Sequence, residues 1–218
     1  MSTSIAVLGG TFNPPHLGHI QGALQVIEHL GIPQLGLMPC KLPPHKTTAG
    51  VSEHHRVAMV SLLCDSNPGL YPELIELDLP APSYSVKTLR ALRRQHPGSP
   101  LLFVMGEDSL NTLESWYQWR TLLSLCHVIV MRRQDLNVSR SAELNLWIEE
   151  HRCHDPAMLS TTRWGQLYIA QTELHQASST AIRNEAAKSG AMMPEVAQWL
   201  PDEIISYINQ HKLYANVK

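Results

Sequence analysis

Short apolar segments that end in glycine or proline alternate with helix-like segments along most of this 218-residue chain. The first, Ser4–Leu8, runs into Gly9-Gly10, and a helix pattern from Leu17 to Leu30 follows. Further strands are predicted at 34–38, 74–77, 101–106, 128–131 and 167–170, and further helices at 52–64, 86–94, from 178 onward and at 195–210. This alternation predicts an α/β fold, a Rossmann-like doubly wound parallel sheet with helices on both faces.

The length of the chain fits one main globular unit, residues 1–218. From 134 to 164 the alternation weakens and polar residues increase, which indicates a peripheral insertion. In a parallel sheet of this kind the ligand crevice lies beyond the carboxyl ends of the strands. Functional residues are therefore expected where a strand passes into the helix that follows it.

Charge and hydropathy exclude several classes of function. The 17 Lys and Arg and the 19 Asp and Glu give a net charge of −2, without the basic footprint of a nucleic-acid-binding protein. No apolar run approaches the roughly 18 residues of a membrane span, and the N-terminus enters a strand-like segment rather than a signal peptide. We therefore expect a cytoplasmic protein that binds neither nucleic acid nor membranes; the sequence gives no indication of its oligomeric state.

The segment Gly9–His19, GGTFNPPHLGH, joins the first predicted strand to the first helix. Its backbone N–H groups and the positive end of the helix dipole face the crevice, where they stabilise an anion. Gly9 and Gly10 let a phosphate approach the backbone, and His16 and His19, three residues apart, point to one side of the first helical turn. A histidine near a helix start is more often an ordinary surface residue, so the strand before it and the helix after it carry the argument.

In this context, HLGH resembles the HxGH signature of the nucleotidyltransferase superfamily, whose members bind ATP at this place. Ala177–Arg183, ASSTAIR, resembles the second signature of the same superfamily, ISSTxIR, again at a helix start. Ser179, Thr180 and Arg183 would offer hydroxyls, N–H groups and a guanidinium to the polyphosphate. An ordinary Ser/Thr helix cap is the alternative interpretation, but the pairing of two motifs favours a nucleotide site.

The middle of the chain resembles the bacterial nicotinate mononucleotide adenylyltransferases. The matching segments are PPHK at 43–46, PSYSVKTL at 82–89, GEDS at 106–109 and SWY at 115–117, and the resemblance covers essentially the whole chain. It implies transfer of AMP from ATP to nicotinate mononucleotide, which yields deamido-NAD and pyrophosphate. Mg²⁺ is expected to bind the ATP oxygens and to keep several waters, so no metal ligand is assigned in the protein.

The resemblance also implies roles for individual residues. Lys46 would contact the triphosphate and Asp108 the ATP ribose, while Trp116 would stack on the nicotinate ring, as an indole can. The residues assigned to catalysis are His16, His19, Lys46 and Arg183. Those assigned to ATP are Gly9, Gly10, Thr11, Phe12, Gly106, Asp108, Ser179 and Thr180. Those assigned to nicotinate mononucleotide are Asn13, Ser85, Trp116, Tyr117 and Arg133.

Two positions depart from the commonest pattern of that family: Asn13 stands where Asp is frequent, and Ser85 where Thr is frequent. Both keep a polar group of similar reach, so they affect fine affinity rather than the activity. The alternative enzymes are HxGH transferases that act on nicotinamide mononucleotide or phosphopantetheine, and the cytidylyltransferases. A non-catalytic nucleotide sensor is an alternative of another class, and it is disfavoured because both motifs keep their phosphate-facing residues.

Overall fold

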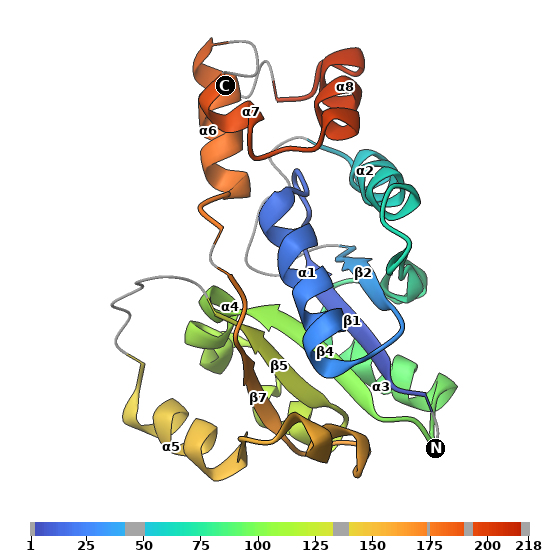
Figure 1. The fold of residues 1–218 in the computed structure, drawn as a ribbon, viewed down its shortest axis with the longest axis vertical. Coiled ribbons are helices and arrows are strands. Elements are labelled where there is room, and N and C mark those ends of the chain that lie inside the picture. Colours follow the sequence, from blue (N-terminus) through green and yellow to red (C-terminus); the bar gives the residue numbers. More distant parts are fainter. Residues whose placement is uncertain (1–2, 42–50, 133–139, 174, 190–193, 215–218) are drawn as a thin grey trace.

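The computed structural model describes residues 3–41, 51–132, 140–173, 175–189 and 194–214 (Figure 1). In these residues the strands form one sheet in the order β3-β2-β1-β4-β5-β7-β6, and every pair of neighbours is parallel. The strands are β1 (Ile5–Gly10), β2 (Leu35–Pro39), β3 (Leu70–Pro72), β4 (Leu101–Gly106), β5 (His127–Met131), β6 (Arg152–Cys153) and β7 (Leu167–Ala170). The order reverses between β1 and β4, which is the switch point where doubly wound sheets bind ligands. The predicted fold class is confirmed.

The helices begin and end close to the predicted limits in most cases. They are α1 (Leu17–Leu30), α2 (Glu53–Asp65), α3 (Ser85–Gln95), α4 (Glu107–Asn111), α5 (Ala142–His151), α6 (Ser179–Ser189), α7 (Pro194–Ala197) and α8 (Asp202–Gln210). Short 3₁₀ helices are η1 (Ile75–Asp78), η2 (Leu113–Ser115), η3 (Trp119–Ser124) and η4 (Pro156–Ser160). Local chemistry explains the limits of α1 and α2: Gly31 ends α1 at a φ of 60°, and the Ser52 hydroxyl caps α2 by accepting the N–H of His55.

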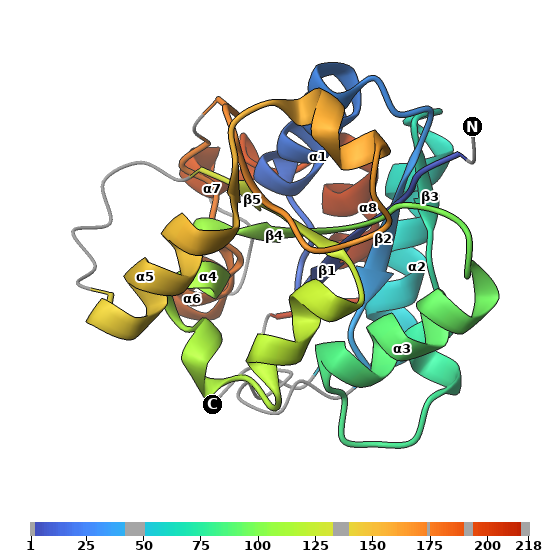
Figure 2. The same cartoon turned by 90° about the horizontal axis from the view of Figure 1, so that it is seen from below.

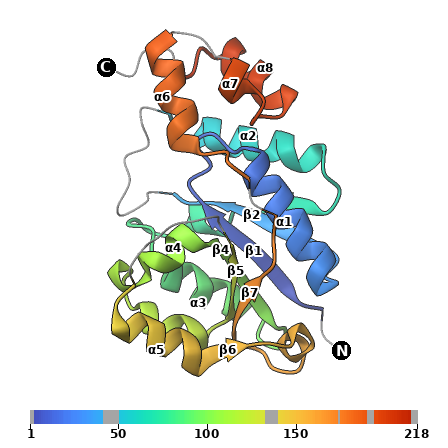
Figure 3. The ribbon, with the colours of Figure 1, turned by 60° about the vertical axis from the view of Figure 1, so that its left-hand side comes forward.

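Both faces of the sheet are buried, because alternate residues of each strand enter two separate apolar clusters. Leu102 and Val104 of β4 pack with α1, α2 and α8, whereas Leu101 and Phe103 pack with α3 and α5 on the other face. Figure 2 shows the strands between α1 and α3, and Figure 3 shows α1 and α2 on the side of the sheet opposite α3 and α5. Helices α6, α7 and α8 gather at one end of the molecule (Figure 1).

The strand predicted at 74–77 is wrong. The strand lies earlier, at Leu70–Pro72, and residues Ile75–Asp78 form η1. The Glu73 carboxylate accepts the N–H of Ile75 at 3.0 Å, and the Glu76 side chain turns inward to meet buried hydroxyl groups. A four-residue run that is largely apolar does not distinguish a strand from a turn of helix, and these polar contacts accompany the helical turn that forms.

The single helix predicted at 195–210 is also wrong, because the chain forms two helices there. Helix α7 ends at Ala197, and α8 begins at Asp202 after Pro201, whose ψ of 149° is extended. Proline has no N–H to donate and clashes with the preceding turn of a helix, so one continuous helix cannot pass through it. The break lets the Trp199 carbonyl oxygen accept the N–H of Leu17 at 2.9 Å, at the start of α1.

Residues 140–164 lie in the connection between β5 and β7. Leu144, Trp147 and Ile148 of α5 are buried in the apolar cluster that also contains Leu101 and Phe103. Strand β6 adds a short strand beside β7. The Arg140 guanidinium donates to the Glu107 carboxylate of α4 at 2.7 Å, in a partly exposed ion pair. This stretch is therefore tied to the helix that follows β4.

Candidate functional site

The turn between β1 and α1 is closely packed against aromatic rings. A Cβ atom on Gly9 would lie 3.0 Å from the Phe103 ring, and one on Gly10 would lie 3.0 Å from the Phe12 ring. Phe12 itself adopts a φ of 48°, which is uncommon for a residue with a side chain. The glycines thus serve close packing of the turn as well as access to its backbone.

His16 and His19 lie together, as their spacing predicts. Their ring centroids are 3.7 Å apart with 32° between the planes. His16 is the N-cap of α1 and is 1% exposed, and its backbone N–H donates to Nδ1 of His19 at 3.2 Å. Because Nδ1 accepts that bond, a neutral His19 carries its proton on Nε2 and can donate it to an anion.

The late serine-arginine segment contacts the early histidine segment directly. Ser179 Oγ donates to the Pro14 carbonyl oxygen at 2.8 Å, and Arg183 Nη1 donates to the Asn13 carbonyl oxygen at 2.6 Å. The other guanidinium nitrogen, Nη2, lies 3.3 Å from Thr180 Oγ1. Segments from opposite ends of the chain therefore form one wall.

A cavity of about 450 Å³ opens against this wall; we call it the histidine cavity. Ligand pockets commonly have volumes of about 300–1,000 Å³. The predicted residues that line it are Gly9, Gly10, Thr11, Phe12, Asn13, His19, Gly106, Asp108, Ser179, Thr180 and Arg183. His16 lies behind His19 and is not part of the lining. All eight residues assigned to ATP thus line one volume.

A second cavity, of about 480 Å³, lies beside the first; we call it the tryptophan cavity. Ser85, Trp116 and Tyr117, all assigned to nicotinate mononucleotide, line it together with apolar side chains from β2 and β4. The two cavities share five lining residues, Gly9, Gly10, Thr11, Asp108 and Ser109. Two ligands bound in these cavities would therefore meet at the carboxyl end of β1.

Aromatic contacts shape the tryptophan cavity. The Trp116 ring lies edge-on to Phe103, with centroids 6.4 Å apart, and the Tyr117 ring lies 4.8 Å from that of Tyr84. Tyr117 is 49% exposed, which is high for a tyrosine that contacts another ring. An exposed aromatic ring at the mouth of an apolar cavity can cover a flat ligand.

Of the remaining predicted site residues, one lies in a different cavity and two cannot be placed. Asn13, assigned to nicotinate mononucleotide, lines the histidine cavity, and its side-chain oxygen accepts a 2.6 Å hydrogen bond from the hydroxyl of Tyr214. Lys46 and Arg133 lie outside the described residues. Their assigned contacts stay predictions.

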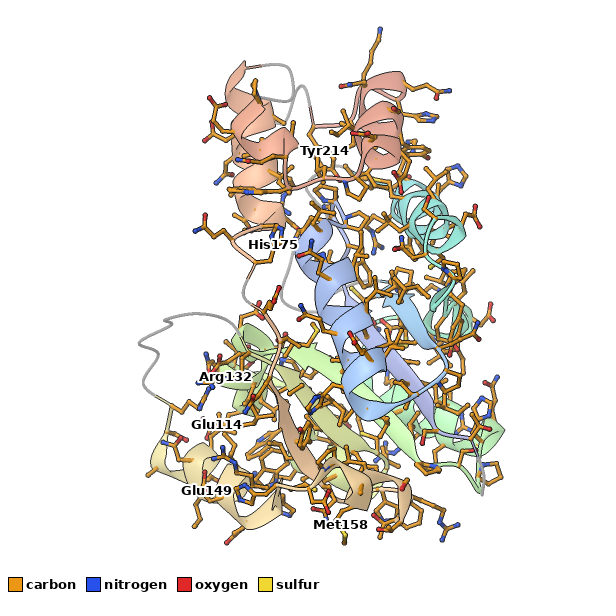
Figure 4. The ribbon with its side chains drawn as sticks, in the orientation of Figure 1. Glu114, Arg132, Glu149, Met158, His175 and Tyr214 are labelled. Atoms are coloured by element: carbon orange, nitrogen blue, oxygen red, sulfur yellow. The ribbon has the colours of Figure 1, made fainter. Side chains whose placement is uncertain are left out.

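Several residues that the sequence analysis did not assign also line or support the cavities. Arg132 and His175 line the histidine cavity, and Figure 4 shows both on the same side of the molecule. Arg56 of α2 is fully buried and donates to the carbonyl oxygens of Thr11 at 3.0 Å and Lys41 at 3.3 Å. A signal for Arg56 exists in the sequence, since it shares the spacing of the buried apolar residues 59, 60 and 63 of α2.

Glu76 of η1 is 4% exposed and lines the tryptophan cavity. Burial raises the pKa of its carboxyl group, and hydrogen bonds from Thr88 and the Lys41 backbone, with the charge of Arg56, oppose that rise. The sequence gives no local signal for this residue, because its partners are hydroxyl groups and a backbone N–H from other segments.

Within the described part of the chain, no three His, Cys, Asp or Glu side chains are grouped so that they could hold a metal ion. None of the helices described is both long and apolar enough to cross a membrane.

Comparisons with known proteins find relatives over nearly the whole chain. The profile of the family described as cytidylyltransferase-like matches residues 7–185. A relative from Shewanella frigidimarina, named "Probable nicotinate-nucleotide adenylyltransferase", is 38% identical and covers 96% of this chain and 99% of its own. A relative of the same name from Pectobacterium atrosepticum is 35% identical and covers 98% of this chain and 100% of its own.

Among solved structures, the nicotinic acid mononucleotide adenylyltransferase of Plasmodium falciparum complexed with NaAD has the same fold. Its TM-score is 0.76 at 16% identity, with all of both chains covered. A second structure of that protein, complexed with APC, has a TM-score of 0.73. At this identity the likeness supports the fold alone.

Proposed function

Because this chain belongs to the cytidylyltransferase-like family and, within it, to the nicotinate-nucleotide adenylyltransferases, we propose that it transfers AMP from ATP to nicotinate mononucleotide. The products are deamido-NAD and pyrophosphate, and the reaction belongs to NAD biosynthesis. The observation that carries the proposal is the pair of adjoining cavities with a common wall at Gly9–Thr11. We further propose that the protein works in the cytoplasm.

ATP is proposed to occupy the histidine cavity. Its phosphates would lie at the N-termini of α1 and α6, where backbone N–H groups and helix dipoles favour negative charge. Asp108, after β4, lines this cavity and can accept hydrogen bonds from the ribose hydroxyls. Lys46 is proposed to contact the triphosphate.

Nicotinate mononucleotide is proposed to occupy the tryptophan cavity. Trp116 offers a flat apolar surface for the pyridine ring, and Ser85 at the first position of α3 offers a hydroxyl and a helix N-terminus for the ring carboxylate. The phosphate of this substrate would then point toward the wall shared by both cavities.

In the proposed reaction, a phosphate oxygen of nicotinate mononucleotide attacks the α-phosphorus of ATP. The bond from that phosphorus to the oxygen bridging to the β-phosphorus breaks, and its electron pair leaves with pyrophosphate. The nucleophile is already an anion, so positioning and charge stabilisation suffice. His19 would donate to the phosphate oxygens as charge develops, His16 would hold His19, and Arg183 with Lys46 would offset charge on the pyrophosphate.

Mg²⁺ is proposed as the metal that accompanies ATP, where it would neutralise part of the phosphate charge. The Asp108 carboxylate lines the histidine cavity and is an acidic group that could contact such an ion, which would keep several waters.

The test is pyrophosphate release from ATP, measured side by side with nicotinate mononucleotide, nicotinamide mononucleotide and phosphopantetheine. We expect the highest kcat/KM with nicotinate mononucleotide. Preference for either other acceptor would overturn the substrate assignment. ATP binding without pyrophosphate release in the presence of any of the three acceptors would support the nucleotide sensor instead.

A further inference from the structure

The buried carboxylate of Glu76 accepts hydrogen bonds from both sides of the turn that leads into α3, in the wall of the tryptophan cavity. Glu76 Oε1 accepts hydrogen bonds from the Ser83 hydroxyl and, at 3.3 Å, from the backbone N–H of Lys41. Glu76 Oε2 accepts one from the Thr88 hydroxyl at 2.8 Å. Both hydroxyl groups are buried, as is Glu76 itself.

The turn between these two hydroxyls is the segment that presents Tyr84 and Ser85 to the cavity. Tyr84 is the N-cap of α3, and no side chain in the described residues caps this helix there. The uncapped N–H groups and the helix dipole make this end of α3 attractive to an anion. The position of the turn therefore determines how closely the N–H groups at the start of α3 approach an anionic group in the tryptophan cavity.

Packing alone does not explain a carboxylate at position 76. Burying a carboxylate is costly unless it is paired and hydrogen-bonded, whereas an apolar residue would pack there without that cost. The charge of the buried Arg56 stabilises the ionised carboxylate. Arg56 also bonds to the carbonyl oxygens of Thr11 and Lys41, so the turn of β1 and the turn of α3 belong to one polar network.

We propose that Glu76 is a positioning residue for substrate specificity: it fixes the Ser83–Ser85 turn so that the start of α3 receives the ring carboxylate of the acceptor nucleotide. The inference rests on the proposed function and deepens it. Glu76 lines the cavity but acts through Ser83, Thr88 and Lys41, which donate to its oxygens, and it does not itself bind the ring carboxylate. It sets the preference for the acid over the amide form of the acceptor.

The experiment compares Glu76→Ala and Glu76→Gln with the wild type, using both nicotinate and nicotinamide mononucleotide. For Glu76→Ala we expect KM for nicotinate mononucleotide to rise about tenfold, which corresponds to about 1.4 kcal/mol, with KM for ATP and kcat changed less than about twofold. The acid-to-amide ratio of kcat/KM should fall by a similar factor. Glu76→Gln should restore most of the loss, because its amide oxygen still accepts and its NH₂ group can donate to the Thr88 hydroxyl.

Glu73→Gln is the matched control, because the Glu73 carboxylate lies in the same loop and accepts the N–H of Ile75, a role that an amide oxygen can keep. It should leave every kinetic constant unchanged. If Glu76→Ala does not fold, Thr88→Val carries the test, since it removes one of the three donors at nearly constant volume, and the same shift is expected on a smaller scale.

Two results would overturn the inference: an unchanged acid-to-amide ratio of kcat/KM in folded Glu76→Ala or Thr88→Val, or an equal rise of KM for ATP and for the acceptor. Failure of the wild type to release pyrophosphate with nicotinate mononucleotide would instead reject the proposed function itself. The two failures are thus separated by the wild-type measurement.

Discussion

Ser179 Oγ donates a hydrogen bond to the Pro14 carbonyl oxygen at 2.8 Å, which joins residues 165 positions apart in the sequence. Pro14 lies just before the histidine pair, and Ser179 is the first residue of α6. With the 2.6 Å bond from Arg183 to Asn13, it fastens the late motif to the early one. The proposed ATP site depends on this junction.

Ser179→Ala removes that junction. We expect the free energy of unfolding to fall by about 1 kcal/mol, as for a typical hydrogen bond, and KM for ATP to rise more than KM for the acceptor. Chemical denaturation and initial rates measure the two effects. Ser160→Ala is the control, since it removes a similar serine-to-carbonyl bond in η4, remote from both cavities, and should leave KM for ATP unchanged.

His19→Ala removes the imidazole that lines the histidine cavity. We expect kcat to fall by at least about 100-fold, the typical effect of losing a donor that stabilises developing charge, while the folded structure is kept. Steady-state rates and the circular dichroism spectrum check both statements. A variant that is well folded and turns over near the wild-type rate would remove His19 from the mechanism.

Trp116→Ala opens the tryptophan cavity but leaves the histidine cavity intact, because Trp116 lines only the former. We expect KM for nicotinate mononucleotide to rise about tenfold or more, from the loss of stacking, with KM for ATP nearly constant. Trp164→Ala is the matched control, since Trp164 packs on Arg163 outside both cavities. Equal losses for both substrates would show that the acceptor site is misplaced.

His127, at the start of β5, predicts a loss of stability at acid pH. Its Nδ1 accepts the N–H of Gln166 at 3.2 Å, so Nε2 carries the proton and donates to the Thr162 carbonyl oxygen at 3.0 Å. Burial, the largest cause, and the charge of Arg93 lower the pKa of this histidine below its ordinary value near 6.5, although the bond to Thr162 opposes the shift.

The unfolded chain therefore binds the extra proton first, and the stabilising contribution of His127 is complete above pH 6.5 and is lost as the pH falls below it. The loss amounts to at most about 1.4 kcal/mol per pH unit. Denaturant titrations at pH 8 to 5 measure it. His127→Gln cannot titrate, so its stability should fall less steeply; parallel curves for variant and wild type would contradict the assignment.

The sheet could be predicted from sequence because its central strands are short, apolar and bounded by glycine or proline. β4 and β7 lie at the predicted positions, and β1 and β5 differ from theirs by only one or two residues at an end. The prediction failed where polar contacts decided the structure: the carboxylates of Glu73 and Glu76 bend the 74–77 segment into η1. The prediction of one helix at 195–210 was wrong because Pro201 interrupts it, although apolar residues recur at helical spacing on both sides of that proline.

For the site as well, residues within sequence motifs were predicted, whereas residues that act through contacts between distant segments were not. Residues carried by motifs at strand ends, such as His19 and Asp108, lie where the topology of a doubly wound sheet directs them. Arg56 and Glu76 were not predicted, because they act through backbone carbonyls, an N–H and hydroxyl groups contributed by distant segments. The spacing of Arg56 with the buried residues of α2 indicates its burial, but the partners of Arg56 and Glu76 leave no fixed spacing in the sequence, and only the folded chain shows them.

The most direct test of the account is a crystal structure with a non-hydrolysable ATP analogue and Mg²⁺. The account predicts a triphosphate in the histidine cavity, within hydrogen-bonding distance of His19 from the early motif and of Ser179, Thr180 or Arg183 from the late one. A triphosphate that contacts only one of the two motifs, or that lies outside the cavity between them, would contradict it.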